Sequence, residues 1–393
     1  MRVITVFCVF LICYRADGVD ILVAYDDGVE SFNSSEHSFR SLVLPSAPVS
    51  AVDYHYQRKE AFAAWDNRIY RFPLFNNDSS RSFSPTSVAN ISLCWSFAVD
   101  WVHDHVFWPD CGIDAAIMMS DLDGGNITVI VPLSQNRPIW IPDIAIDPYR
   151  GLLFWISDGS VLSCGLDGRE ITTVAKLAFT EAVNLVLDMV AKRIYLLSRN
   201  KSFNGIYYLE YHSSEPLLIH DEVDGKIWSF SVYKSQLYLC YDSSNGTYLT
   251  TRSVADHATS KQQLTNLSKT VWHMKVIDPE LQTPPEIDQC TAKGCSHHCV
   301  VQESLALCSC PRNFHLGRDQ RICEIIQVKN DTFVSVLEGI ACVVFILFAA
   351  GILMCLCDKV WSNVHPTVVR VTSPSNSFKR RIYKGSDLSE NLI

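Results

Sequence analysis

Between Ile21 and Ile277 the apolar residues come in short runs, separated by turns rich in Asp, Asn, Ser and Gly. Short runs of β-branched and aromatic residues between such turns are typical of β-strands, and no long helical period interrupts them. The stretch Ala98–Asp110 shows the pattern most clearly, because two apolar runs flank a polar turn there. The pattern predicts an all-β domain.

The predicted strand pairs repeat along the chain. Four units open with an apolar residue followed by an aspartate: Asp53, Asp100, Asp147 and Asp188. These aspartates lie 47, 47 and 41 residues apart, and Tyr233 and Ile277 mark a degenerate fifth and a sixth opening. Periods of about 40 to 50 residues with four short strands are typical of propeller blades.

The sequence therefore predicts a six-bladed β-propeller over residues 19–278. Ile21–Tyr25 and Val29–Phe32 precede the first full unit. We expect them to complete a blade with the last strands, because such closure removes exposed sheet edges.

Within ten residues of each of the first five openings lies a tetrad that begins with an aromatic residue. The copies are Phe62–Trp65, Phe107–Asp110, Phe154–Ser157, Tyr195–Ser198 and Tyr238–Tyr241. Two of them continue into a Leu-Asp-Gly turn, at residues 122–124 and 166–168. These features resemble the YWTD, or class B, repeats of the low-density lipoprotein receptor family, whose six repeats form a six-bladed propeller.

The resemblance implies structural roles within the blades for a set of residues: Asp100, Phe107, Trp108, Asp110, Asp147, Trp155 and Asp188. For Asp110, the fourth residue of its tetrad, it implies a buried hydrogen bond between neighbouring blades. The substitution Asp110→Ala is therefore expected to cost about 1 to 3 kcal/mol.

Six cysteines follow the repeats over residues 286–324, in the spacing C-x4-C-x3-C-x8-C-x-C-x12-C. Such density implies disulfides in an oxidising compartment, and six cysteines allow fifteen pairings. The framework resembles the EGF-like module that follows YWTD propellers in the same family, and the overall layout is also similar to the cueball proteins. The resemblance implies the pairs Cys290–Cys299, Cys295–Cys308 and Cys310–Cys323.

Two apolar segments predict passage through the secretory pathway and a membrane. Residues 1–18 combine a basic start with a short apolar run, as in a signal peptide. Residues 339–357 carry no charge and nearly cross a bilayer, so a transmembrane helix is expected over residues 333–357. A stalk at 325–332 and a basic cytoplasmic tail at 358–393 complete a single-pass type I plasma-membrane protein.

Eight sequons on the expected lumenal side predict a glycoprotein. They are Asn33, Asn77, Asn90, Asn126, Asn200, Asn245, Asn266 and Asn330. The formal net charge of −9 argues against nucleic-acid binding.

The sequence carries no catalytic motif such as G-x-S-x-G or H-E-x-x-H, so we expect neither an enzyme nor a cofactor. The EGF-like entry at residues 286–289 resembles a calcium site, but the plain structural module is favoured. Zinc at His297 and His298, or at His103 and His105, is a weaker alternative to solvated histidines. No metal site is predicted.

Four tryptophans recur shortly before a blade opening: Trp95, Trp140, Trp228 and Trp272. A shared position favours a core role between blades over a surface hot spot. Four further cysteines lie in the propeller: Cys94, Cys111, Cys164 and Cys240. Cys94 and Cys111 are expected either to pair or to remain free buried thiols.

The preferred function is a cell-surface receptor or co-receptor that binds an extracellular protein ligand through its propeller. A Wnt-type role is implied by the resemblance alone. The alternative is an endocytic or trafficking receptor, also present in endosomes, whose tail binds a cytoplasmic adaptor.

Overall fold

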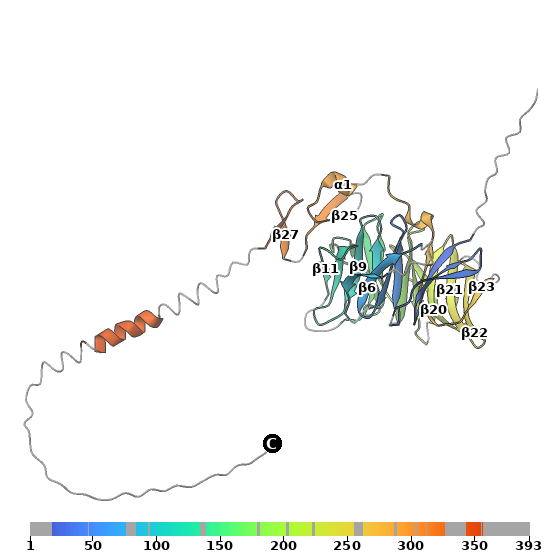
Figure 1. Ribbon diagram of the computed structural model, residues 1–393, viewed down its shortest axis with the longest axis horizontal. Coiled ribbons are helices and arrows are strands. Elements are labelled where there is room, and N and C mark those ends of the chain that lie inside the picture. The colour runs from blue at the N-terminus through green and yellow to red at the C-terminus, as the bar shows by residue number, and fades with distance from the viewer. Residues whose placement is uncertain are drawn as a thin grey trace, which may run out of the picture. The chain divides into compact units, whose positions relative to one another are not determined.

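The computed structural model (Figure 1) describes residues 18–326 and 343–356, apart from short internal gaps. The gaps are 46, 76–83, 93–94, 134–138, 179–180, 202–203, 222–224, 255–261, 287–288, 303–304, 312 and 355. The signal peptide, most of the stalk, the tail, Asn77, Cys94 and Asn330 lie outside the described residues. Residues 1–326 and 327–393 form two separate units.

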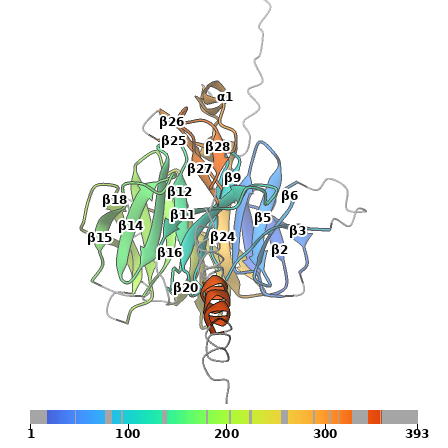
Figure 2. The ribbon, with the colours of Figure 1, turned by 90° about the vertical axis from the view of Figure 1, so that its left-hand side faces the viewer.

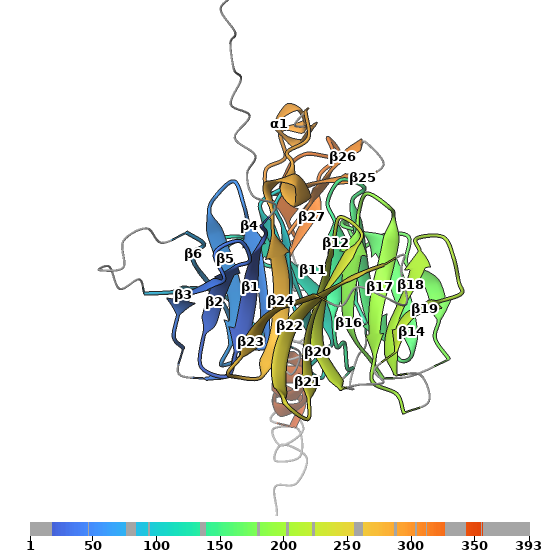
Figure 3. The same cartoon turned by 90° about the vertical axis from the view of Figure 1, so that its right-hand side faces the viewer.

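Six antiparallel sheets of four strands surround a central axis (Figures 2 and 3). The first blade contains β4 (Ala51–His55), β5 (Glu60–Trp65), β6 (Arg68–Pro73) and β7 (Thr86–Asn90). The second contains β8 (Ala98–Asp100), β9 (His105–Asp110), β10 (Ala116–Asp121) and β11 (Thr128–Pro132). The third contains β12 (Ile144–Asp147), β13 (Leu152–Ser157), β14 (Ser160–Gly165) and β15 (Thr172–Lys176).

The remaining blades follow the same order. The fourth contains β16 (Ala182–Asp188), β17 (Arg193–Ser198), β18 (Gly205–Glu210) and β19 (Leu217–Asp221). The fifth contains β20 (Lys226–Tyr233), β21 (Gln236–Ser243), β22 (Gly246–Ser253) and β23 (Gln262–Leu267). The sixth joins β24 (Val271–Ile277) to β1 (Asp20–Tyr25), β2 (Val29–Asn33) and β3 (Ser38–Val43).

The predicted six-bladed propeller and its closure are confirmed. β24 pairs antiparallel with β1, so the two ends of the repeat region share one blade. The inner strands form a closed ring in the order β4, β8, β12, β16, β20, β24 and back to β4. Closure leaves each inner strand flanked by two others.

The hydrophobic core lies in the wedges between blades. Phe107, Trp108 and Trp155 are at most 2% exposed, as the aromatic tetrads predicted. Phe107 and Trp155 belong to one cluster between the second and third blades, whereas Trp108 belongs to the cluster between the first and second. Alternating side chains of a strand thus pack against the two neighbouring blades.

Three of the regularly spaced aspartates cap the turn between the first two strands of their blades. Asp100 is fully buried and accepts the N–H groups of Val102 and His103 at 3.1 Å. Asp147 accepts the Arg150 N–H at 3.2 Å, and Asp188 accepts the Ala191 N–H at 2.9 Å. Such Asx turns satisfy backbone donors where the ladder ends.

The first blade departs from the predicted alignment by two residues. His55, not Asp53, pairs with the first residue of the second strand and so occupies the place of Asp100. Asp53 instead accepts the Val99 N–H of the second blade at 3.0 Å.

The glycine of the Leu-Asp-Gly turn is required by close packing between blades. A Cβ on Gly124 would lie 2.0 Å from the Val88 carbonyl oxygen of the preceding blade.

The role expected of Asp110 is wrong. Asp110 is half-buried at the end of β9, and its carboxylate accepts the N–H of nearby Gly112 at 3.2 Å. Side chains in or just before the inner strands make such inter-blade hydrogen bonds instead. They include Val99 N to Asp53, Ile144 N to Ser96, Leu185 N to Asp143, Ser229 Oγ to Asn184, Met274 N to Ser229, Val276 N to Ser231 and Val52 N to His273.

A small disulfide-rich module follows the propeller. It contains α1 (Gln289–Lys293) and two hairpins, β25 (His298–Gln302) with β26 (Leu305–Ser309) and β27 (Phe314–Leu316) with β28 (Cys323–Ile325). Its disulfides are Cys290–Cys299, Cys295–Cys308 and Cys310–Cys323, the three pairs that the resemblance implied.

Residues 343–354 are helical. Within the part of the chain that the structure describes, no helix meets the length and apolarity needed to cross a membrane.

Candidate functional site

A cavity of about 510 Å³ opens at the end of the propeller axis where the inner strands begin. Its walls come from the segments that lead into the inner strands of all six blades. Ligand cavities are typically of this size, and a channel mouth gathers side chains from segments far apart in sequence. This cavity is the candidate binding site.

The four recurring tryptophans line this cavity. Trp95 and Trp140 are each 55% exposed and Trp272 is 42% exposed, so the core role expected for them is wrong. Trp95 packs edge-on against Trp140 with ring centroids 5.9 Å apart, and Trp228 packs edge-on against Trp272 at 5.3 Å. The tryptophans recur because each lies just before or at the start of an inner strand, and that position lies at the channel mouth.

Hydrogen bonds and cations hold two of the indoles in place. Trp272 Nε1 donates to Asp26 Oδ1 at 2.6 Å, and Trp228 Nε1 donates to Asp242. The Arg199 guanidinium lies 5.3 Å from the Trp228 ring centroid and donates to the Trp228 carbonyl oxygen at 2.9 Å. The indole faces are thereby oriented before any partner binds.

The polar groups that line the cavity belong to the inter-blade hydrogen bonds. Asp143 accepts the Leu185 N–H at 2.7 Å, the Asn184 amide at 2.8 Å and the Ser96 hydroxyl. Burial raises the pKa of the Asp143 carboxyl. These groups are already engaged, so the cavity presents mainly its apolar ring faces and the exposed Asp66 carboxylate to a partner, with Asp26 and Asp242 beside the indoles.

The half-buried His273 closes the ring of blades. Its Nδ1 accepts the Val52 N–H at 3.3 Å, which joins the sixth blade to the first. Burial and the nearby Lys275 ammonium lower the pKa of His273 to about 3. The ring is therefore neutral at pH 7, as an acceptor nitrogen requires.

The opposite end of the axis is narrow. The cavity there is about 90 Å³, and Leu281 and Gln282 from the segment after β24 contribute to its lining. Gln282 is buried, where its side chain donates to the Tyr54 carbonyl oxygen at 2.9 Å and accepts the Tyr56 N–H at 2.7 Å. The two ends of the axis are thus different surfaces.

The EGF-like module packs on this second face, as Figures 2 and 3 show. Val300 is fully buried in the cluster between the second and third blades, and the Val301 N–H donates to His103 at 3.2 Å. A Cβ on Gly151 would lie 1.8 Å from the Val301 carbonyl oxygen. The close approach requires glycine at that turn.

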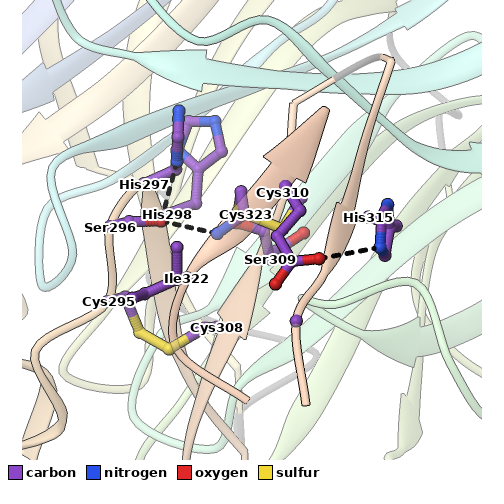
Figure 4. Close-up of a disulfide and its surroundings, with 12 residues drawn as sticks. Cys295, Ser296, His297, His298, Cys308, Ser309, Cys310, His315, Ile322 and Cys323 are labelled. Atoms are coloured by element: carbon purple, nitrogen blue, oxygen red, sulfur yellow. Dashed lines mark hydrogen bonds and ion pairs between the residues drawn. A yellow bond between two sulfur atoms is a disulfide. The ribbon is translucent and has the colours of Figure 1, made fainter. Parts of the chain in front are cut away.

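Figure 4 shows the interior of the module near its disulfides. The Ser296 hydroxyl accepts the Cys323 N–H at 2.9 Å and contacts the half-buried His297 ring. The adjacent His298 is only 1% exposed. The two neighbouring histidines therefore differ in burial, which the sequence alone did not reveal.

The predicted glycosylation sites are accessible, and the propeller cysteines are buried or paired. The described sequon asparagines are exposed or half-buried: Asn33, Asn90, Asn126, Asn200, Asn245 and Asn266. Cys164 and Cys240 are buried free thiols, and burial raises the pKa of Cys164 to about 12. Cys111 is disulfide-bonded, and Cys94 lies outside the described residues.

Comparisons with known proteins agree with this architecture. No family model matches the chain. The chain is 24% identical to the vitellogenin receptor Yl of Drosophila melanogaster over 246 residues, which are 61% of this chain and 12% of that receptor. The chain is homologous to the low-density lipoprotein receptor family.

Solved structures share the fold at low sequence identity. A chain in a crystal structure of a nidogen/laminin complex matches with a TM-score of 0.53 and 15% identity, over 66% of this chain and 98% of that one. TolB from Acinetobacter baumannii matches with a TM-score of 0.51 and 10% identity, over 66% of each chain. These similarities support the propeller fold, and function is argued separately from the site.

Proposed function

We propose that this chain is a cell-surface receptor that binds an extracellular protein through the tryptophan-lined end of its propeller. The main support for this proposal is the cavity itself, in which three tryptophans remain 42% to 55% exposed. Exposed tryptophans that converge on one cavity are typical of binding hot spots, and a solitary surface aromatic would carry no such meaning. Homology to a receptor supports the same role.

The ligand that fits this site is a protein loop with an apolar side chain at its tip and hydrogen-bond donors beside it. The apolar side chain would enter among the indoles, and the donors would meet the Asp26 and Asp242 carboxylates at the rim. Of the two carboxylates that line the cavity, Asp143 is committed to hydrogen bonds between blades and Asp66 is exposed at its edge.

Membrane anchorage through residues 333–357, glycosylation and a type I orientation are parts of the same proposal, supported by the sequence pattern. A Wnt-type ligand is one finer hypothesis, and vitellogenin, named by the relative, suggests cargo uptake as another. Uptake depends on the tail. Unchanged surface residence after deletion of residues 358–393 would rule out a tail-driven endocytic receptor.

The binding proposal is tested on cells that display the full-length chain. Individually tagged secreted proteins are screened for saturable binding, and each binder is retested on the double substitution Trp95→Ala and Trp140→Ala. We expect at least about a 10-fold loss of affinity, since two hot-spot aromatics each contribute 1 kcal/mol or more.

The matched control is Leu217→Ala, which removes an exposed apolar side chain from β19, the outer strand of the fourth blade. It should leave binding unchanged. If every saturable binder tolerates the double substitution, the tryptophan-lined cavity is not the binding site.

A further inference from the structure

Three side chains meet where the EGF-like module contacts the second blade. His105 begins β9, Asp121 ends β10 and His298 begins β25. One nitrogen or oxygen atom from each lies within 4.8 Å of the others. The two histidines are 193 positions apart in sequence, so only the folded chain joins them.

The hydrogen bonding of His298 determines which of its nitrogens carries a proton. His298 Nε2 contacts the Asn126 carbonyl oxygen, which can only accept, so Nε2 must be protonated. In the neutral ring Nδ1 then presents a lone pair. That lone pair faces Asp121 Oδ1 at 3.2 Å, which is also an acceptor. Two acceptors this close repel each other unless a proton or a metal ion lies between them.

His105 brings a second unsatisfied imidazole to the same point. Its Nε2 lies 3.9 Å from Asp121 Oδ1, and its ring packs edge-on against His298 with centroids 4.9 Å apart. Among the residues that the structure describes, neither His105 Nδ1 nor His298 Nδ1 has a hydrogen-bond partner. Both rings are at least nine-tenths buried, where an unpaired polar atom is costly.

Protonation of His298 would account for its contact with Asp121 but not for the nearby His105 ring. It would pair His298 with Asp121 but place a charged ring against the buried His105 ring, whose centroid lies 4.9 Å away. Both rings are buried, and burial favours the neutral form of an imidazole. Neutral imidazoles beside a carboxylate are the donors that a divalent transition metal selects.

We propose that His105, Asp121 and His298 bind one zinc ion that joins the EGF-like module to the propeller. Zinc bonds of about 2.0 to 2.2 Å in tetrahedral geometry place ligand atoms about 3.3 Å apart, close to the separation of His298 Nδ1 and Asp121 Oδ1. His105 approaches by a small side-chain rotation. The Asp121 side chain is 39% exposed, which leaves an entry path and a fourth position for water.

Asn126 supports two of the three ligands. Its carbonyl oxygen accepts from His298 Nε2, and its Nδ2 donates to Asp121 Oδ2 at 2.8 Å. Hydrogen bonds of this kind orient metal ligands and set the histidine tautomer. The left-handed backbone of Asn126, with φ of 53°, places both groups on the same side of the turn.

The test uses the full-length chain, made through a secretory pathway, stripped with a chelator and titrated with zinc chloride. Bound zinc is counted per chain by elemental analysis. We expect one zinc per wild-type chain and at least about 10-fold weaker binding in His298→Gln and in Asp121→Asn. His297→Gln, which changes the half-buried neighbour outside the proposed site, should bind as the wild type does.

A second measurement does not depend on the variants folding. Cobalt(II) added to the stripped wild-type chain should develop the strong visible absorption of a four-coordinate site, and stoichiometric zinc should abolish it. Absence of saturable zinc binding and of this absorption by the wild type would overturn the proposal. Equal loss of binding in His297→Gln would do so as well, since it would indicate adventitious metal.

Discussion

Acid should weaken the closure of the propeller through His273. The neutral ring accepts the Val52 N–H and so joins the last blade to the first. Burial and Lys275 lower its pKa to about 3, from an ordinary value of 6.5 in the unfolded chain. Between these values the unfolded state binds the extra proton, so the free energy of unfolding falls as the pH falls.

The size of the effect follows from the two pKa values. The stabilisation is complete above about pH 6.5 and is lost progressively as the pH approaches 3. At pH 5 the linkage relation for one group gives a loss of about 2 kcal/mol relative to pH 8. For a domain of this size that corresponds to a melting temperature lower by about 4 °C or more.

The comparison that isolates His273 is His273→Asn. Asparagine Oδ1 occupies the place of Nδ1 and can accept the same N–H, but it does not titrate. Calorimetric melting of the wild-type and His273→Asn chains at pH 8 and pH 5 gives two pH-dependent losses. The wild type should lose about 2 kcal/mol more than the variant. Equal losses would refute the assignment of a low pKa to the closing histidine.

Two further predictions concern the blades and the module. Asp143→Ala should cost roughly 3 kcal/mol, because it leaves the buried donors of Leu185, Asn184 and Ser96 unsatisfied, whereas Asp110→Ala should cost less than about 1 kcal/mol. Urea unfolding of both variants checks this, and equal costs would contradict the inner-ring assignment. Gly151→Ala should loosen the module from the propeller, seen as faster protease cleavage after Ile277 with an unchanged melting temperature of the propeller.

The repeat period was sufficient to predict the blades. Strand alternation and the aromatic tetrads report burial within each sheet, so Phe107, Trp108 and Trp155 were correctly expected in the core. The count of openings also predicted that β1 and β24 share a blade. These features depend on local pattern and on the need to remove sheet edges.

The candidate site could not be predicted in the same way. Recurrence shows that Trp95 and Trp140 occupy equivalent places, but it does not distinguish a wedge between blades from the mouth of the channel. The zinc proposal depends on a contact between His105 and His298 across 193 positions. A single sequence contains no signal for such a contact. The prediction for Asp110 was wrong for a different reason. Residues at the inner strands make the inter-blade hydrogen bonds that were expected of Asp110.

The shared blade has a consequence for biosynthesis. Strands β1 to β3 leave the ribosome first, yet their inner partner β24 begins only at Val271. At about 5 to 20 residues per second, the edge of β1 waits about 12 to 50 s for that partner. During this interval one edge of β1 has unpaired backbone groups that are open to neighbouring nascent chains, so we expect chaperones that bind these strands to raise the yield of folded protein.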